Sequence, residues 1–191
     1  MTDTGIFYGT GASEGVPSPF CDCPMCNYAR EHGGKDVRKR SCFRLGRNIM
    51  IDMGPDIFTQ ALQYGSMCDI EHVLITHTHD DHFDFTALGL MSMATHLRTT
   101  PVHFYFSEEG YRFIELLRDS EIAFGGSLRG WKKGIYAFHK LKYFETYSIG
   151  EYEGYTDSWK SRREYGKRAQ RKLRAEGKDG TKMLYGMDTG L

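Results

Sequence analysis

The stretch "LITHTHDDHFDF", residues 74–85, places three histidines and three aspartates directly behind a short apolar run. His77 and His79 alternate at the end of this run, so a strand there directs both rings to one side. Asp81 and His82 follow in the turn that leads into the next helical pattern. Neutral imidazoles together with a carboxylate are ligands that zinc, manganese and iron prefer in proteins. A lone histidine is usually structural, but this cluster predicts a metal site.

The segments around this stretch alternate between strand and helix patterns. The apolar run over residues 72–76 predicts a strand buried on both faces. Asp56 and Asp84 precede helical patterns and are expected to be N-caps. This alternation predicts a layered α/β domain. Further strands are expected at 5–8, at 42–53 as a pair with a turn near Gly46, and at 101–107; the helices are expected to carry Ile57, Phe58, Ala61 and Leu62, then Leu88, Met91 and Leu97, and to span 109–117.

The composition is balanced in charge, with 25 Lys+Arg and 25 Asp+Glu among 191 residues. A balanced charge gives no overall field that attracts nucleic acid or a membrane surface, so partners must be inferred from local sites. No signal-peptide pattern opens the sequence, and no apolar stretch reaches the roughly 18 residues of a membrane helix. We therefore expect a cytoplasmic protein without a membrane partner.

The five cysteines include a crowded group, Cys21, Cys23 and Cys26. Together with the missing export signal, this spacing favours metal binding over disulfides. Three thiolates fit a tetrahedral zinc that lacks one ligand, and free thiols in a turn are the alternative. Cys42 and Cys68 stand alone and are expected to be small core residues.

Two further segments have a distinctive composition. Residues 9–15 form a glycine-rich turn without the Gly-Lys-Ser/Thr ending of a phosphate-binding loop, which favours a loop that needs positive φ. Residues 159–178 carry nine Lys and Arg against two Glu. Such a run is typical of a solvated helix or tail, and nucleic-acid binding is the second, less favoured interpretation.

Several motifs together resemble the metallo-β-lactamase superfamily, in the branch of phosphoribosyl 1,2-cyclic phosphate phosphodiesterases and ribonuclease Z. The resemblance covers residues 5–153 and 181–190 of a single expected domain, 1–191, and is poor over the basic segment at about 156–178. The motifs are Thr76-His-Thr-His-Asp-Asp-His82, the glycine-rich stretch 9–17, the cysteine stretch 21–26, Arg40-Ser41, Ile51-Asp-Met-Gly-Pro-Asp56 and Leu184-Tyr-Gly-Met-Asp-Thr-Gly190.

The resemblance implies a four-layer αββα sandwich with two divalent metal ions, zinc or manganese, at one edge. It assigns His77 and His79 to the first metal, Asp81 and His82 to the second, and Asp188 to a bridge between them. Asp52 would orient the ligands from behind. The cysteines would hold a structural zinc that a distant histidine completes.

The resemblance also implies a hydrolase, most closely a phosphodiesterase. A dinuclear metal-bound hydroxide would attack the phosphodiester, with Asp81 and His82 as the catalytic residues. The expected substrate is a cyclic phosphate, a nucleotide or an RNA-like molecule. A homodimer is left open as the assembly.

The sequence departs from the family pattern in its C-terminal part. The family pattern has a further histidine before the bridging aspartate and another after it, but residues 159–178 contain no histidine. His103 and His139 lie too far upstream to replace the first one by motif. We therefore expect an incomplete member with a truncated C-terminal part. The alternative to the enzyme is a non-catalytic, metal-binding remnant.

Overall fold

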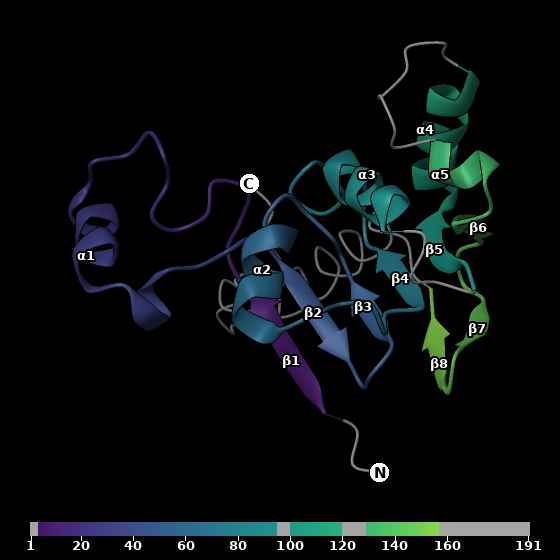
Figure 1. Ribbon diagram of the computed structural model, residues 1–191, viewed down its shortest axis with the longest axis horizontal. Helices are drawn as coiled ribbons and strands as arrows, with labels where there is room; N and C mark the ends of the chain where they lie inside the picture. The colour runs from purple at the N-terminus through teal and green to yellow at the C-terminus, as the bar shows by residue number, and fades with distance from the viewer. Residues whose placement is uncertain (1–3, 95–99, 120–128, 157–191) are drawn as a thin grey trace, which may run out of the picture. The chain divides into compact units, whose positions relative to one another are not determined.

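The computed structural model describes residues 4–94, 100–119 and 129–156 (Figure 1). The chain divides into two compact units, residues 1–141 and 142–191. The expected single domain stays a prediction. The basic run and Asp188 lie outside the described residues.

A mixed six-stranded sheet forms the centre of the first unit, in the order β1-β2-β3-β4-β5-β6. The first three strands are antiparallel, and β3 to β6 are parallel. The expected strand pair over residues 42–53 is confirmed, and Gly46, at φ 57°, lies in the turn between its strands. The strands are β1 (Gly5–Gly9), β2 (Cys42–Leu45), β3 (Ile49–Ile51), β4 (His72–Ile75), β5 (Val102–Ser107) and β6 (Tyr136–Leu141).

Helices lie on one face of this sheet, where α2, α3, α4 and α5 contribute to the same core. Asp84 is the N-cap of α3, as expected, because its side chain accepts a hydrogen bond from the Thr86 backbone at 2.9 Å. The helices are α1 (Pro24–His32), the short 3₁₀ helix η1 (Gly34–Asp36), α2 (Ile57–Tyr64), α3 (Phe85–Met93), α4 (Glu108–Asp119) and α5 (Arg129–Lys132).

Strands β4 and β5 alternate between a buried face and a half-buried face. Val73 and Ile75 of β4 are buried in the core, whereas His72 and Leu74 are only half-buried. The expectation that this strand is buried on both faces was therefore wrong. Successive side chains of a strand point to opposite faces, and the helices pack on the face that carries Val73.

Helix α2 carries Ile57, Phe58, Ala61 and Leu62, as expected, and Asp56 lies at its N-cap position, but the expected side-chain cap was wrong. The side chain of Asp56 does not cap the helix, because its carboxylate is bound to the backbone and guanidinium of Arg40. Phe58 and Leu62 are 65% and 73% exposed, because α2 packs through the opposite side, where Gln60 is buried.

Only one of the two isolated cysteines is a core residue. Cys42 is 1% exposed, and burial raises the pKa of its thiol to about 12. Cys68 is exposed, which corrects the expectation of a core position. It lies after α2 in the loop that leads to β4, where no strand or helix face buries it.

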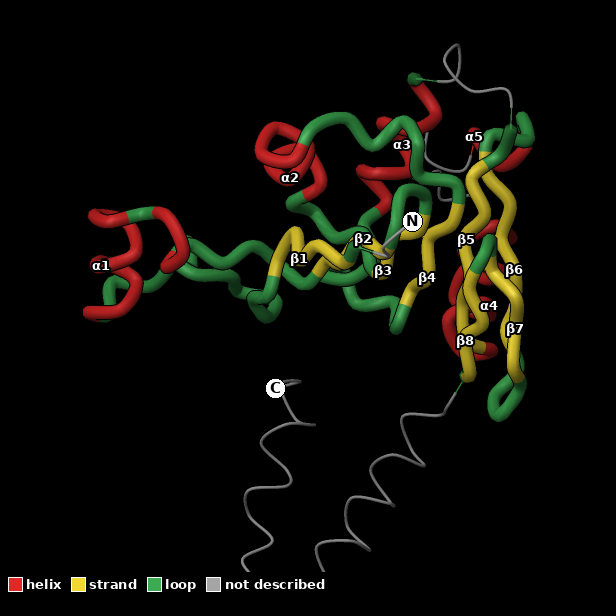
Figure 2. Tube along the Cα trace, turned by 90° about the horizontal axis from the view of Figure 1, so that it is seen from below, coloured by secondary structure: helices red, strands yellow, loops and turns green. Residues whose placement is uncertain are grey.

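The segment between β1 and β2 extends away from the sheet and carries α1 (Figures 1 and 2). Its two arms are joined where Gly11 pairs with Arg40 and Val16 pairs with Arg38. A Cβ atom at Gly9 would lie 1.9 Å from the Arg40 carbonyl oxygen, so the arms approach this closely only with glycine there. The expected positive φ occurs at Gly15, at 65°.

The described part of the second unit is an antiparallel hairpin of β7 (Thr146–Ile149) and β8 (Tyr152–Tyr155), with Gly150 at φ 60° in its turn. The backbones of Glu145 and Thr156 continue the pairing beyond the strands. In neither unit does a described helix have the length and apolar character to cross a bilayer.

Candidate metal centre

The loop after β4 folds back so that residues from its two ends meet. The carbonyl of His79 accepts hydrogen bonds from the backbone N–H groups of His82 and Phe83, at 3.0 and 2.8 Å. This tight turn brings the rings of His77 and His82 to 4.0 Å between centroids. One potential ligand atom from each of His77, Asp81 and His82 lies within 4.8 Å of the others. These three residues form the candidate metal centre.

Asp52 lies at the end of β3 and organises this centre from behind. The residue is 3% exposed, and its Oδ2 accepts a hydrogen bond from His82 Nδ1 at 2.7 Å. A carboxylate only accepts, so His82 carries its proton on Nδ1 and directs the Nε2 lone pair to the Asp81 side, where Asp81 Oδ2 lies 3.3 Å away. An imidazole held in this tautomer is oriented for metal binding.

Thr76 was not among the residues singled out in the sequence, although it opens the histidine motif. Its backbone N–H donates to Asp52 Oδ1 at 2.8 Å, and its hydroxyl lies 2.9 Å from both carboxylate oxygens. The carboxylate of Asp52 is therefore fixed by Thr76 on one side and by His82 on the other. The position of Thr76 directly before His77 was the available signal.

The backbone of residues 52–54 is fitted closely to the loop of the centre. Asp52 has φ 62°, in the left-handed region that costs most residues energy. Met53 exchanges backbone hydrogen bonds with His82 and Asp84, at 2.7 and 3.0 Å. A Cβ atom at Gly54 would lie 2.1 Å from the Asp81 carbonyl oxygen, so this approach requires glycine. The segment that follows β3 thus fixes the position of the loop through main-chain contacts.

The pKa values of His77 and His82 are shifted in opposite directions by their surroundings. Burial lowers the pKa of His77, and the neighbouring His82 and His79 lower it further. Burial also opposes the charged form of His82, but the hydrogen bond that His82 donates to Asp52 and the charges of Asp52 and Asp81 outweigh burial and raise the pKa of His82. The two carboxylates therefore favour positive charge at this position, either as a proton or as a metal ion on His82 Nε2.

Four further histidines, in the loop and in the sheet, are not among the residues whose ligand atoms converge. The His79 ring lies 4.7 Å from the His77 ring and is exposed, and it is not one of the three residues whose ligand atoms converge. His103 Nδ1 and His139 Nε2 lie 2.8 Å apart on β5 and β6, in a stack that includes His72. Neither joins the centre, in agreement with the sequence argument against them.

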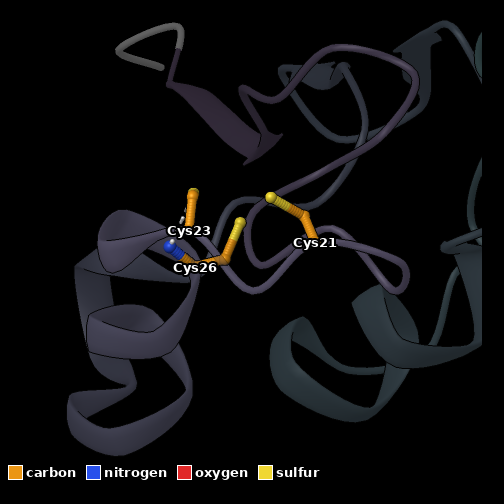
Figure 3. A group of neighbouring side chains, drawn as sticks. All are labelled: Cys21, Cys23 and Cys26. Atoms are coloured by element: carbon orange, nitrogen blue, oxygen red, sulfur yellow. Dashed lines mark hydrogen bonds between the residues drawn. The ribbon is translucent and has the colours of Figure 1, made fainter.

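The three cysteines also converge, at the start of α1. Figure 3 shows Cys21 on the loop before the helix and its sulfur turned toward that of Cys26. Cys23 is the N-cap, and its sulfur accepts a hydrogen bond from the Cys26 backbone at 3.5 Å, which with the neighbouring thiols lowers the pKa of Cys23. The potential ligand atoms of the three thiols lie within 4.8 Å of one another. Pro24 at the first helical position starts α1 there.

Comparison with known proteins supports the sequence resemblance. A solved structure described as a new diphosphatase from the PhnP family is 25% identical, with a TM-score of 0.59, over 79% of this chain and 54% of that chain. The chain has the metallo-β-lactamase fold. Zn²⁺-bound PqqB from Methylobacterium extorquens shares the fold at 17% identity and a TM-score of 0.55, over 75% of this chain and 48% of that chain. The predicted resemblance to the metallo-β-lactamase superfamily is confirmed.

The sequence comparisons cover less of the chain. No model of a protein family matches it. An octanoyltransferase from Porphyromonas gingivalis strain W83 is 37% identical over 81 residues, which are 40% of this chain and 16% of that protein. The chain thus spans about half the length of the similar solved structures and a small part of this relative.

Proposed function

We propose that this protein is a metal-dependent hydrolase that cleaves phosphodiesters. The observation that carries the proposal is the hydrogen bond between buried Asp52 and His82, which sets the tautomer that directs the Nε2 lone pair of His82 to the space beside Asp81. A carboxylate that accepts from the far ring nitrogen of a histidine is the usual partner of a metal-binding imidazole. Together with the convergence of His77, this arrangement fits a metal ligand set.

The donor set suits zinc or manganese. His77, Asp81 and His82 would hold one divalent ion, while exposed His79 has the freedom to turn toward a metal. Asp188 is proposed as the bridge to a second ion. Bound divalent ions supply charge that neutralises phosphoryl oxygens and lower the pKa of water. The protein's own part is to orient His82 through Asp52 and to fix the carboxylate of Asp81.

A phosphodiester is proposed because the better-matched solved structure is a diphosphatase, and phosphorus–oxygen bonds are the chemistry of that protein. Within this class, a small cyclic phosphate, a nucleotide or an RNA-like molecule are the proposed substrates, with Asp81 and His82 as the catalytic residues. The same fold hosts different hydrolytic reactions, so the fold alone does not select among them.

The cysteine cluster is proposed as a structural zinc site. The sulfurs come from a loop and from the N-terminus of α1, where the backbone N–H groups stabilise a thiolate. Three thiolates and one further ligand complete a tetrahedral zinc.

Elemental analysis of the purified chain, together with hydrolysis of a bis-aryl phosphate, tests the proposed function. His82→Ala should lower both metal content at the centre and turnover, the latter by about 100-fold. His32→Ala is the matched control, because His32 contacts Tyr28 at the end of α1 and lies in neither cluster.

Two results would contradict the enzyme. Metal bound at His82 without turnover of any phosphodiester would favour the non-catalytic metal-binding protein. Turnover that survives His82→Ala and removal of metal by a chelator would exclude the centre as the source of activity.

A further inference from the structure

A cavity of about 250 Å³ opens beside the edge strand β1, away from both metal clusters. Its walls come from the end of β1, from the end of α2 and from the segment that includes η1. None of the residues of the metal centre or the cysteine cluster lines it. Because a water molecule occupies about 30 Å³ in the liquid, the cavity has room for a small ligand group with some of its hydration.

The lining of this cavity is positive. Lys35, Arg38 and Lys39 line it, and no Asp or Glu does. None of the three forms an ion pair with a carboxylate in the described residues. The next basic residue, Arg40, is different, because its guanidinium binds the Asp56 carboxylate at 2.9 Å. The chain as a whole has no net charge, so three uncompensated cations around one cavity are a local feature.

The residues around Lys39 add hydrogen-bond donors to this lining. The ammonium of Lys39 donates to the side-chain oxygen of Gln63 and lies 5.9 Å from the centroid of the Tyr64 ring. Tyr64 is stacked on buried Tyr8, with centroids 4.3 Å apart and planes 4° apart. Lys39 binds the side-chain oxygen of Gln63, so the amide nitrogen of Gln63 has no acceptor in the described part of the chain and can donate, as can the hydroxyl of Thr10.

We propose that this cavity binds a phosphate group. A carboxylate would compensate one of the three cations, whereas a phosphate monoester carries about −1.5 to −2 charges and three acceptor oxygens at pH 7. Arginine and lysine bind such oxygens through charge-assisted hydrogen bonds. The phosphate would be free or part of a nucleotide, or the ligand would be successive backbone phosphates of an oligonucleotide, each of which carries one charge. This site is separate from the metal centre and does not depend on catalysis there.

Isothermal titration of the full chain tests this site. The ligands are inorganic phosphate, acetate and a short single-stranded oligonucleotide. Lys35→Gln combined with Arg38→Gln should weaken phosphate or oligonucleotide binding about tenfold. Lys133→Gln combined with Lys140→Gln is the matched control, since it removes the same charge from exposed positions outside the cavity.

Each outcome decides the proposal. Saturable binding of inorganic phosphate, weakened only by the cavity variant, identifies a site for the free anion. Binding of the oligonucleotide alone, with affinity that falls steeply with salt, identifies a backbone phosphate as the ligand. Equal losses in both double variants, acetate binding as tight as phosphate, or no binding up to about 10 mM would overturn the proposal. If the cavity variant fails to fold in thermal unfolding, the two single variants replace it.

Discussion

The two candidate metal clusters are built in opposite ways. The metal centre combines Asp52 from the end of β3 with a loop that follows β4, and backbone hydrogen bonds join these segments. The cysteine cluster comes from residues 21–26, on a segment that extends away from the sheet, and its organiser is the first turn of α1. The centre therefore depends on the folded sheet, whereas the cysteine cluster depends on local structure.

This difference predicts different chemistry at the two clusters. A histidine centre exchanges few protons for metal, because the lowered pKa of His77 favours its neutral form and only the raised pKa of His82 retains a proton that a metal must displace. A thiol cluster releases a proton from every thiol that it ionises. The clusters can therefore be separated by pH, by substitutions near the sheet, and by the loss of single hydrogen bonds.

The largest expected effect is on the pH dependence of metal affinity. At the cysteine cluster, three thiols ionise on binding, so affinity should fall by up to about 1,000-fold per pH unit below the thiol pKa values. At the metal centre, the raised pKa of His82 means that its proton is retained to a higher pH. Affinity there should be constant above this pKa and fall about tenfold per unit below it. Zinc titrations of Cys26→Ser and His82→Ala proteins between pH 5 and 9 measure each cluster alone; equal slopes would contradict this difference.

Asp52→Asn should give the next largest effect. The backbone conformation at φ 62° tolerates asparagine, but the amide loses the negative charge that holds the His82 tautomer. Metal affinity at the centre should fall about 10- to 100-fold, with zinc at the cysteine cluster unchanged. Asp56→Asn is the control, because Asp56 binds Arg40 and does not contact His82. Competition with a metal-sensing dye measures the metal affinity of both clusters in each variant.

Gly54→Ala should destabilise the fold by about 1 to 3 kcal/mol, because the added Cβ meets the Asp81 carbonyl oxygen at 2.1 Å. Gly33→Ala is the comparison near the cysteine cluster, since it has φ 63° with nothing within 4 Å and should cost only about 1 kcal/mol. Denaturant unfolding followed by circular dichroism compares the two. A larger loss at Gly33 would show that conformational strain outweighs the close approach.

Thr76→Val should have the smallest effect, about 1 kcal/mol of stability, because Asp52 loses one donor and keeps two others. Thr76→Ser retains the hydroxyl and should restore most of this loss. Thermal unfolding at matched pH measures both variants, and an equal loss in serine and valine would point to the methyl group instead.

The sequence predicted the fold because its signals were local and repeated. The apolar run of β4, the Asp84 cap and the motif around His77 each follow from neighbouring residues. The predictions that were wrong depend on distant contacts. Asp56 has the sequence of a helix cap, but Arg40 from the preceding segment takes its carboxylate. Cys68 gave no signal that separates it from buried Cys42.

The candidate centre was predictable only in part for the same reason. The ligand types and the role expected for Asp52 came from motifs, whereas the contact between Thr76 and Asp52 joins segments 24 residues apart. The cavity beside β1 was not foreseen, because its walls come from three separate segments and no short pattern contains them.

The unusual backbone of Asp52 limits which residues can occupy that position. The position has two independent requirements. Its left-handed conformation is readily adopted by glycine, asparagine and aspartate, whereas the orientation of His82 requires a carboxylate. Glutamate meets only the second requirement, and asparagine meets only the first. Aspartate is the one amino acid that meets both requirements. In a library randomised at this codon and selected for metal-dependent function, we therefore expect to recover only aspartate at position 52.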